Sequence, residues 1–313
     1  MSGAAEAAAR PDPNAEIRLV GLRSLRGANF WSRRPVVRMD VAVGAYDEIH
    51  SADVPGFTEA LVSALPGLWE HRCSVGEHGG FVTRLREGTY APHIAEHVAL
   101  ELQSMIGHEV GYGRARGGDR PGEYTVVLAH LHAAVGMRAA ALGLEVVRRA
   151  FAGRLDGVGA ALEELRALAD TEDAPPLEGR VLCGVTGGGE LAVVREEMLR
   201  LGAYGAAPVV EVSPEYLLSA GLPYARSEAA VILDGGVPGV PPRYAEPEMA
   251  RRLLAVIADG VPEGGTVVVP AAEREVQGLV REAGRRVAPF EGGPAEAAAA
   301  AVRALAGHQV ETG

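Results

Sequence analysis

Two histidines one helical turn apart carry the clearest chemical signal in the chain. Residues 93–97 read HIAEH, and the helix that this segment predicts begins at Pro92. Residues four apart share one face of a helix, so His93 and His97 can hold one Zn²⁺ at about 2.0–2.1 Å. Glu96 is the expected general base on a zinc-bound water, because this spacing is the inverted form of a metallopeptidase motif.

The third ligand of such a site stays open. Glu101 lies one turn beyond His97 and offers a carboxylate oxygen, while Glu70 and His71 are rival candidates from an earlier segment. Glu70 is also a second candidate for acid–base work. The alternative explanation is an ordinary solvated face, because the opposite side of this helix carries an apolar stripe. The spacing by itself does not decide between the two.

A second polar stretch precedes this helix. His71, Cys73 and His78 suggest either a separate metal cluster or a cysteine–histidine nucleophile pair, and neither has a recognised spacing. Arginines that could grip a carboxylate with two parallel hydrogen bonds follow in the same half of the chain. They are Arg84, Arg86, Arg114 and Arg116. Plain surface arginines are the alternative explanation for each of them.

Composition narrows the class of protein. The 313 residues include 30 basic and 41 acidic side chains, for a net charge of −11, so nucleic acid and anionic membranes are not expected partners. No lysine occurs, which excludes Schiff-base chemistry and a phosphate-binding lysine. No apolar run approaches the roughly 20 residues that span a bilayer. Two cysteines do not make a disulfide framework, so a cytoplasmic location is expected.

Changes in pattern along the chain predict four parts. Residues 1–16 form an Ala-rich disordered tail, and residues 17–174 mix strands and helices as an α+β domain. A polar, Pro-rich segment ends that domain. Strands then alternate with helices over residues 175–292, which predicts a doubly wound parallel α/β domain. Residues 293–313 read as a terminal helix and tail. A homo-oligomer is compatible with this organisation.

Several long motifs resemble the amino-terminal domain of cyanophycin synthetase. They are LRGANFWS (25–32), LPGLWEHRCS (65–74), HIAEHVALELQ (93–103) and GYGRAR (111–116). In that family this domain engages cyanophycin, a poly-aspartate backbone with arginine on each side-chain carboxyl, and in some members it resembles a metallopeptidase. The resemblance implies hydrolytic positions at His93, Glu96 and His97, with Glu70, His71 and Glu101 nearby.

The second half resembles the ATPase module of a Mur ligase, which is derived from the P-loop fold. Residues 184–191 read GVTGGGEL where that family has a GVTGTNGKTT phosphate loop. The lysine is absent, and Glu190 stands where phosphate charge would approach. The ATP-grasp domain that separates the two halves in the synthetases has no counterpart in this sequence. The resemblance therefore implies a degenerate scaffold, and ATP-dependent ligation is not expected.

Two functions remain at this point. The first is a zinc-dependent, metallopeptidase-like hydrolase that cleaves cyanophycin or a related Asp-Arg peptide. The second is a noncatalytic cyanophycin-binding or regulatory protein, a relic of the synthetase that assists a full-length partner. The first is the main expectation because the H-x-x-E-H spacing and the resemblance point the same way.

Overall fold

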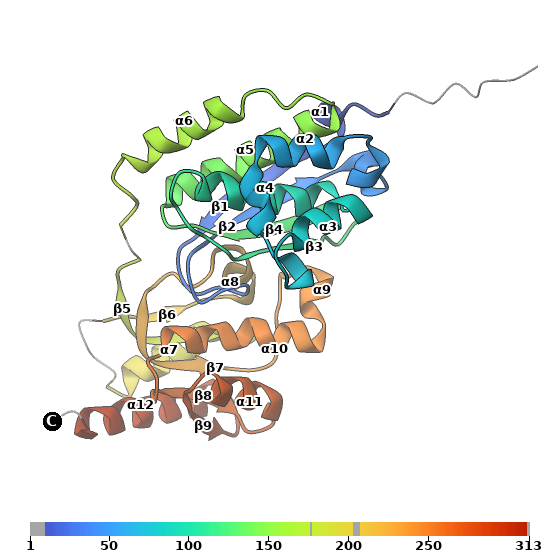
Figure 1. Ribbon diagram of the computed structural model, residues 1–313. Helices are drawn as coiled ribbons and strands as arrows, with labels where there is room; N and C mark the ends of the chain where they lie inside the picture. Colours follow the sequence, from blue (N-terminus) through green and yellow to red (C-terminus); the bar gives the residue numbers. More distant parts are fainter. Residues whose placement is uncertain (1–9, 176, 203–206, 312–313) are drawn as a thin grey trace, which may run out of the picture. The chain divides into compact units, whose positions relative to one another are not determined.

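The computed structural model describes residues 10–175, 177–202 and 207–311 of the chain (Figure 1). The chain divides into two compact units. The first unit comprises Met1–Ser24 and Val36–Ala174, and the second comprises Leu25–Pro35 and Pro175–Gly313. Residues 1–9 of the expected tail lie outside the described residues, whereas Pro13–Glu16 forms the short helix α1.

A four-stranded sheet in the order β1-β2-β4-β3 is the base of the first unit. Its strands are β1 (Arg18–Leu25), β2 (Val36–Ala42), β3 (Gly113–Gly117) and β4 (Glu123–Ala129). Strands β2 and β3 both pair antiparallel with β4. Alternate residues of β2, such as Met39 and Val41, are buried, so one face of the sheet packs into the apolar core.

Helices α4 (Ala91–Ser104) and α5 (Ala133–Phe151) pack against the sheet. Helices α2 (Phe57–Ala64), α3 (Gly80–Glu87) and α6 (Val158–Ala169) contribute to the same apolar core. Helix α4 begins with a proline in its first turn, as its sequence predicts. Small residues bring α4 and α5 into close contact, because a Cβ at Gly143 would lie 3.0 Å from the backbone nitrogen of Ala99. This packing buries α4 on almost every side, so its polar side chains enter the protein interior.

The second unit is built on a five-stranded parallel sheet in the order β6-β5-β7-β8-β9. The strands are β5 (Arg180–Thr186), β6 (Val209–Glu211), β7 (Arg226–Ile232), β8 (Thr266–Pro270) and β9 (Arg286–Phe290). One apolar cluster joins the sheet to α7 (Leu191–Arg200) and α12 (Pro294–Glu311). A second cluster joins it to α8 (Pro214–Ala220), α10 (Pro247–Ala255), α11 (Arg274–Glu282) and the short α9 (Pro242–Ala245). The coarse expectation of a mixed amino-terminal domain and an α/β domain agrees with this architecture.

The segment Leu25–Pro35 packs within the second unit. The side chain of Asn29 is 3% exposed, and its Oδ1 accepts hydrogen bonds from the backbone N–H groups of Trp31 and Ser32 at 3.1 and 3.0 Å. The ring of Phe30 meets Tyr244 edge-on at 5.3 Å between centroids. The LRGANFWS motif therefore has a structural explanation, as a loop that is ordered by Asn29 and anchored by aromatic contacts.

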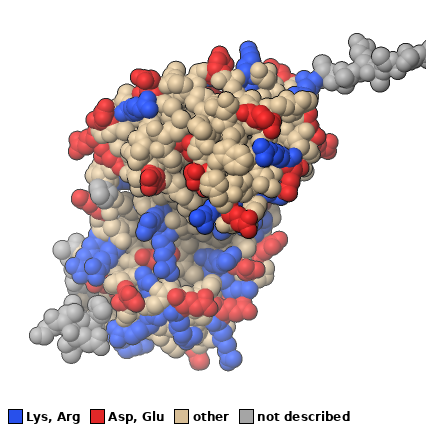
Figure 2. Space-filling view, in the orientation of Figure 1, with Lys and Arg blue, Asp and Glu red and all other residues tan. Residues whose placement is uncertain are grey.

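Charged side chains of both signs lie on the surface. Figure 2 shows that acidic and basic side chains both occur on the visible face of each unit. Among the described residues, no helix combines the length and apolar character needed to cross a membrane.

Candidate functional site

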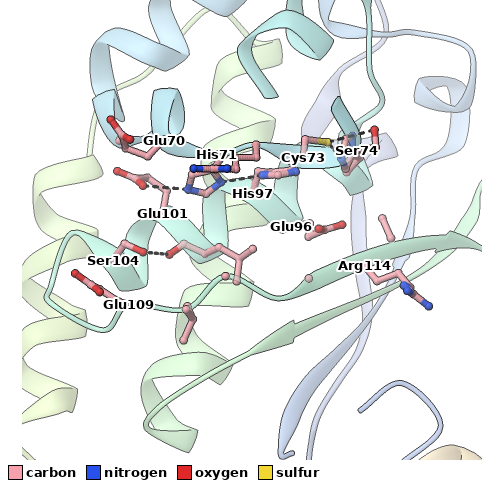
Figure 3. A pocket seen from close by; sticks show the side chains of 18 of the residues that line it. Glu70, His71, Cys73, Ser74, Glu96, His97, Glu101, Ser104, Glu109 and Arg114 are labelled. Carbon is pink, nitrogen blue, oxygen red and sulfur yellow. Dashed lines mark hydrogen bonds and ion pairs between the residues drawn. The ribbon is translucent and has the colours of Figure 1, made fainter. Parts of the chain in front are cut away.

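A cleft of about 900 Å³ lies in the first unit, beside α4 and β3 (Figure 3). Its walls come from the turn-rich segment after α2, from α4 and from the chain that leads into β3. Two tight turns, Pro66–Glu70 and Cys73–Val75, shape the first of these walls. The cleft therefore brings together most of the side chains that the sequence marks as reactive.

Cys73, His93 and His97 form a compact group of potential metal ligands. One ligand atom from each lies within 4.8 Å of the others, and the Sγ of Cys73 is 3.3 Å from the Nε2 of His93. Cys73 has a φ of +51°, the only positive value at a non-glycine residue in the described part of the chain. Such a conformation costs on the order of 1 kcal/mol or more and persists where the surroundings enforce it. The backbone is thus strained at the residue whose thiol lies beside the two histidines.

A relay of hydrogen bonds orients His97. The Nε2 of His71 lies 3.3 Å from Glu101, and its Nδ1 lies 2.8 Å from the Nδ1 of His97. In the neutral tautomer of His71 that donates Nε2–H to the carboxylate, its Nδ1 accepts from the Nδ1–H of His97. That arrangement leaves the Nε2 of His97 with a free lone pair. On the other side of the cluster, Thr89 Oγ1 lies 2.8 Å from the Nδ1 of His93 and orients that ring. Both histidines can thus direct Nε2 toward one metal ion.

Burial keeps both histidines neutral. Desolvation lowers the pKa of His93 to about 4, and the nearby Arg84 acts in the same direction. Desolvation, followed by the charges of His93 and His71, lowers the pKa of His97 to about 2. The ring of Phe81 stacks on His97 with centroids 3.8 Å apart and contributes to this desolvation. Neutral imidazole is the form that binds a metal, so these two side chains are poised as ligands at neutral pH.

Glu96 is buried in the wall of the cleft rather than in the cluster. Burial raises its pKa to about 7, although a backbone hydrogen bond from Ala115 and the charge of Arg114 act in the opposite direction. Gly113 makes room for the carboxyl group, because a Cβ there would lie 2.7 Å from it. Gly67 makes room for the carboxylate of Glu101 in the same way. Glycine is therefore required at two places where the wall meets a buried acid.

The structure distributes the predicted metal ligands over two layers. His93 and His97 lie in the cluster with Cys73. His71 and Glu101 lie behind His97, where they orient it. Glu70 is exposed at the cleft and pairs with His78 at 3.1 Å, and Figure 3 shows it at one end of the cleft.

The four predicted arginines also separate. Arg114 and Arg116 lie on β3 and line the cleft. Arg84 and Arg86 lie on α3 and do not line it. They form long ion pairs of 3.8 Å with Glu87 and 3.9 Å with Glu59, and the guanidinium of Arg86 lies 5.5 Å from the ring centroid of Trp69. Of these four arginines, only the β3 pair lines the cleft, where Arg72 also lies.

Burial decides one alternative that the sequence left open. Glu96, His97 and Glu101 are 6, 6 and 4% exposed, so this side of α4 is not an ordinary solvated face. Sequence reasoning missed Thr89, whose only signal is its position four residues before His93. It considered Cys73 as part of a separate metal cluster or of a cysteine–histidine nucleophile pair, because nothing in the sequence relates a turn residue to a helix 20 positions later.

Comparison with known proteins supports the resemblance that the motifs indicated. Residues 37–152 match the family described as the cyanophycin synthase-like N-terminal domain. Cyanophycin synthetases of Trichormus variabilis and Nostoc sp. are each 36% identical to this chain over 259 residues, which is 80% of this chain and 27% of each relative. The cyanophycin synthetase of Synechocystis sp. is 43% identical over 127 residues, 40% of this chain and 14% of the relative. This chain therefore spans about a quarter of the length of the first two relatives.

The expectation of a zinc-dependent, metallopeptidase-like hydrolase is contradicted by these relatives. They are named as synthetases, which join substrates, and none of the three is named as a peptide hydrolase. The H-x-x-E-H spacing misled because it specifies which side chains share a helix face and not what that face does. The noncatalytic alternative fits the relatives better.

Proposed function

This chain is a cyanophycin synthetase-like protein, and from that premise we propose that it binds cyanophycin or a related Asp-Arg polymer without cutting it. In this proposal the chain is a binding or regulatory protein that acts beside a full-length synthetase. The observation that carries it is the cleft beside α4, which offers exposed groups of both charges to one ligand.

The charges of the cleft match those of the polymer. Glu70 and Glu109 are exposed and suit a guanidinium group, while Arg114 and Arg116 are exposed and suit a carboxylate. Figure 3 shows Glu70 and Glu109 on one side of the cleft and Arg114 on the other. A chain of aspartate units that carry arginine presents both groups at short repeats. Such a ligand can satisfy both ends of the cleft at once.

For the second unit we propose a doubly wound, Mur-ligase-like scaffold. Its parallel strand order and its glycine-rich turn after β5 support this assignment. The same turn carries Glu190 and lacks a lysine, which supports a role without nucleotide chemistry. Its contribution would be structural.

Zn²⁺ binding stays a separate prediction. Cys73, His93 and His97 would hold the ion, since one thiolate and two neutral imidazoles are ligands that zinc prefers. The ion would supply a crosslink between the turn Cys73–Val75 and α4, and so rigidify a wall of the cleft. This structural role requires no bond cleavage.

Co-sedimentation with insoluble cyanophycin tests the proposal. The full chain should pellet with the polymer, and the supernatant should contain no released peptides. A charge-reversed variant, Arg114→Glu with Arg116→Glu, should stay in solution. Arg166→Glu is the matched control, because Arg166 is an exposed arginine on α6 away from the cleft. Equal pelleting of all three proteins, or none, contradicts the proposal, and soluble peptides contradict its noncatalytic part.

A further inference from the structure

The loops at the carboxyl ends of β5 and β7 make an unexpected contact with each other. In the sheet order β6-β5-β7, the chain leaves β5 for one neighbour and later returns to the other (Figure 1). The loops after β5 and β7 therefore start side by side and diverge. In open parallel sheets this is the place where anionic ligands bind, with backbone N–H groups as donors.

Asp234 occupies that place. Its Oδ1 accepts a hydrogen bond from the N–H of Gly188 at 2.7 Å and another from the N–H of Gly236 at 2.8 Å. Gly188 belongs to the loop after β5, and Gly236 belongs to the loop after β7. One carboxylate oxygen thus draws donors from both loops, which is the pattern that a phosphate oxygen receives in a glycine-rich cradle.

The glycines are fitted closely around this carboxylate. A Cβ at Gly188 would lie 2.8 Å from the Cα of Gly236, and a Cβ at Gly189 would lie 2.7 Å from the Oδ2 of Asp234. A side chain at Gly188 would require the two loops to move apart, and one at Gly189 would displace the carboxylate of Asp234. The close approach of backbone to an anion, which glycine-rich loops normally reserve for a ligand, is here made to a side chain of the same chain.

We propose that the second unit contains a latent oxyanion site that Asp234 masks from within. The ligand class that the site would take is phosphate or pyrophosphate, since two converging backbone donors on one oxygen suit a tetrahedral oxyanion. Because Asp234 is tethered two residues from Gly236, its carboxylate competes at a high effective concentration. The negative charge of Glu190, the residue before α7, opposes an incoming anion as well.

Three variants of the full chain separate the effect of the acceptor oxygen at position 234 from the effect of its negative charge. All carry Glu190→Gln, so that only position 234 differs. The first keeps Asp234, the second adds Asp234→Asn, and the third adds Asp234→Ala. Asparagine retains an acceptor oxygen for the Gly188 and Gly236 N–H groups without the charge, whereas alanine removes the acceptor. The probe is inorganic pyrophosphate, followed by calorimetry and by amide exchange measured at Gly188 and Gly236.

The Asp234→Ala protein should bind pyrophosphate in the millimolar range, and its two glycine amides should exchange at least about 10-fold faster than those of the other two proteins. The protein that keeps Asp234 and the Asp234→Asn protein should show no saturable heat, because an acceptor oxygen still occupies both N–H groups. Pyrophosphate binding of equal strength in all three, or none in a folded Asp234→Ala protein, overturns the proposal. Asp234→Leu, which has nearly the shape of asparagine but no acceptor oxygen, serves in the same role if the alanine variant does not fold.

Discussion

The cleft beside α4 and the loops after β5 and β7 use charged side chains in opposite ways. In the cleft, Glu109, Arg114 and Arg116 are exposed in an open volume. In the loops, the carboxylate of Asp234 accepts hydrogen bonds from two backbone N–H groups. A charged group exposed beside a cavity is available to a ligand, whereas a group that is paired within the chain is part of the architecture.

The cysteines repeat this contrast at the level of single residues. Cys73 is partly exposed and touches His93 at the cleft. Cys183 is fully buried on β5, and burial raises the pKa of its thiol to about 12. Only the first is therefore expected to show thiolate chemistry.

The largest expected effect is on zinc binding. Cys73→Ala should weaken zinc affinity by about 100-fold or more, because two remaining histidines rarely hold zinc. His93→Ala and His97→Ala should act in the same way. Zinc per chain, measured after dialysis against a weak chelator, checks this. The matched control is Cys183→Ala, which should keep its zinc, and stoichiometric zinc in Cys73→Ala would place the metal elsewhere.

Thr89→Ala tests the same site by removing a group that orients one of its ligands. Loss of a group that orients a ligand typically costs about 10–100-fold in metal affinity, so this variant should fall between the native protein and Cys73→Ala. An affinity equal to that of the native protein would show that the 2.8 Å contact with His93 does not matter.

Glu96→Gln should change the pH dependence of stability. Burial raises the pKa of Glu96 from 4.5 to about 7, so the folded state holds this proton more tightly than the unfolded state. The associated stability is complete below pH 4.5 and is lost as the pH rises through 7. Glutamine cannot ionise, so it does not lose this stability as the pH rises. From acid to alkaline pH, the free energy of unfolding of the variant should therefore increase by about 3 kcal/mol relative to that of the native protein.

Urea unfolding of both proteins at about pH 4.5 and about pH 8.5, with a chelator present, measures this gain. The same difference in free energy of unfolding at the two pH values would contradict the prediction. The comparison also shows whether the wall of the cleft carries a buried neutral acid at neutral pH.

Substitution of single arginines should have a smaller effect, on polymer binding, and this effect should differ between the cleft and α3. Arg114→Gln should weaken polymer binding by about 10-fold, which corresponds to about 1.4 kcal/mol for one charge-assisted contact. Arg84→Gln and Arg86→Gln should change it by less than about 2-fold, because neither residue lines the cleft. Polymer depletion curves at fixed ionic strength give the affinities. A larger loss for either α3 variant than for Arg114→Gln would move the binding surface to α3.

The smallest expected effect is that of MgATP. The loop after β5 has no lysine, carries Glu190 and is already bonded to Asp234. At a concentration far below the dissociation constant, a ligand does not raise the melting temperature. Thermal unfolding with and without about 1 mM MgATP should therefore coincide. A saturable heat of binding in calorimetry would contradict the proposal that Asp234 masks the loop after β5.

Local patterns predicted much of the fold. Proline at the start of α4 and the alternation of strands with helices after Pro175 are periodic or local features, and the structure shows both. The membership of Leu25–Pro35 in the second unit has no such signal. That loop is held in the second unit by Phe30, whose ring meets Tyr244, and by Ala28, whose carbonyl accepts from the N–H of Leu222, and both partners lie far along the chain.

By itself the sequence determined that His93 and His97 share a helix face and that the turn after β5 lacks a phosphate-binding lysine. Tertiary structure alone decided that Cys73 joins the histidines, that His71 and Glu101 lie behind His97, and that Asp234 bonds to the loop after β5. The physical reason is the separation along the sequence of the residues that interact. Helical periodicity acts over four residues, whereas the contacts of Cys73 with His93 and of Asp234 with Gly188 join positions 20 and 46 apart, which only packing brings together.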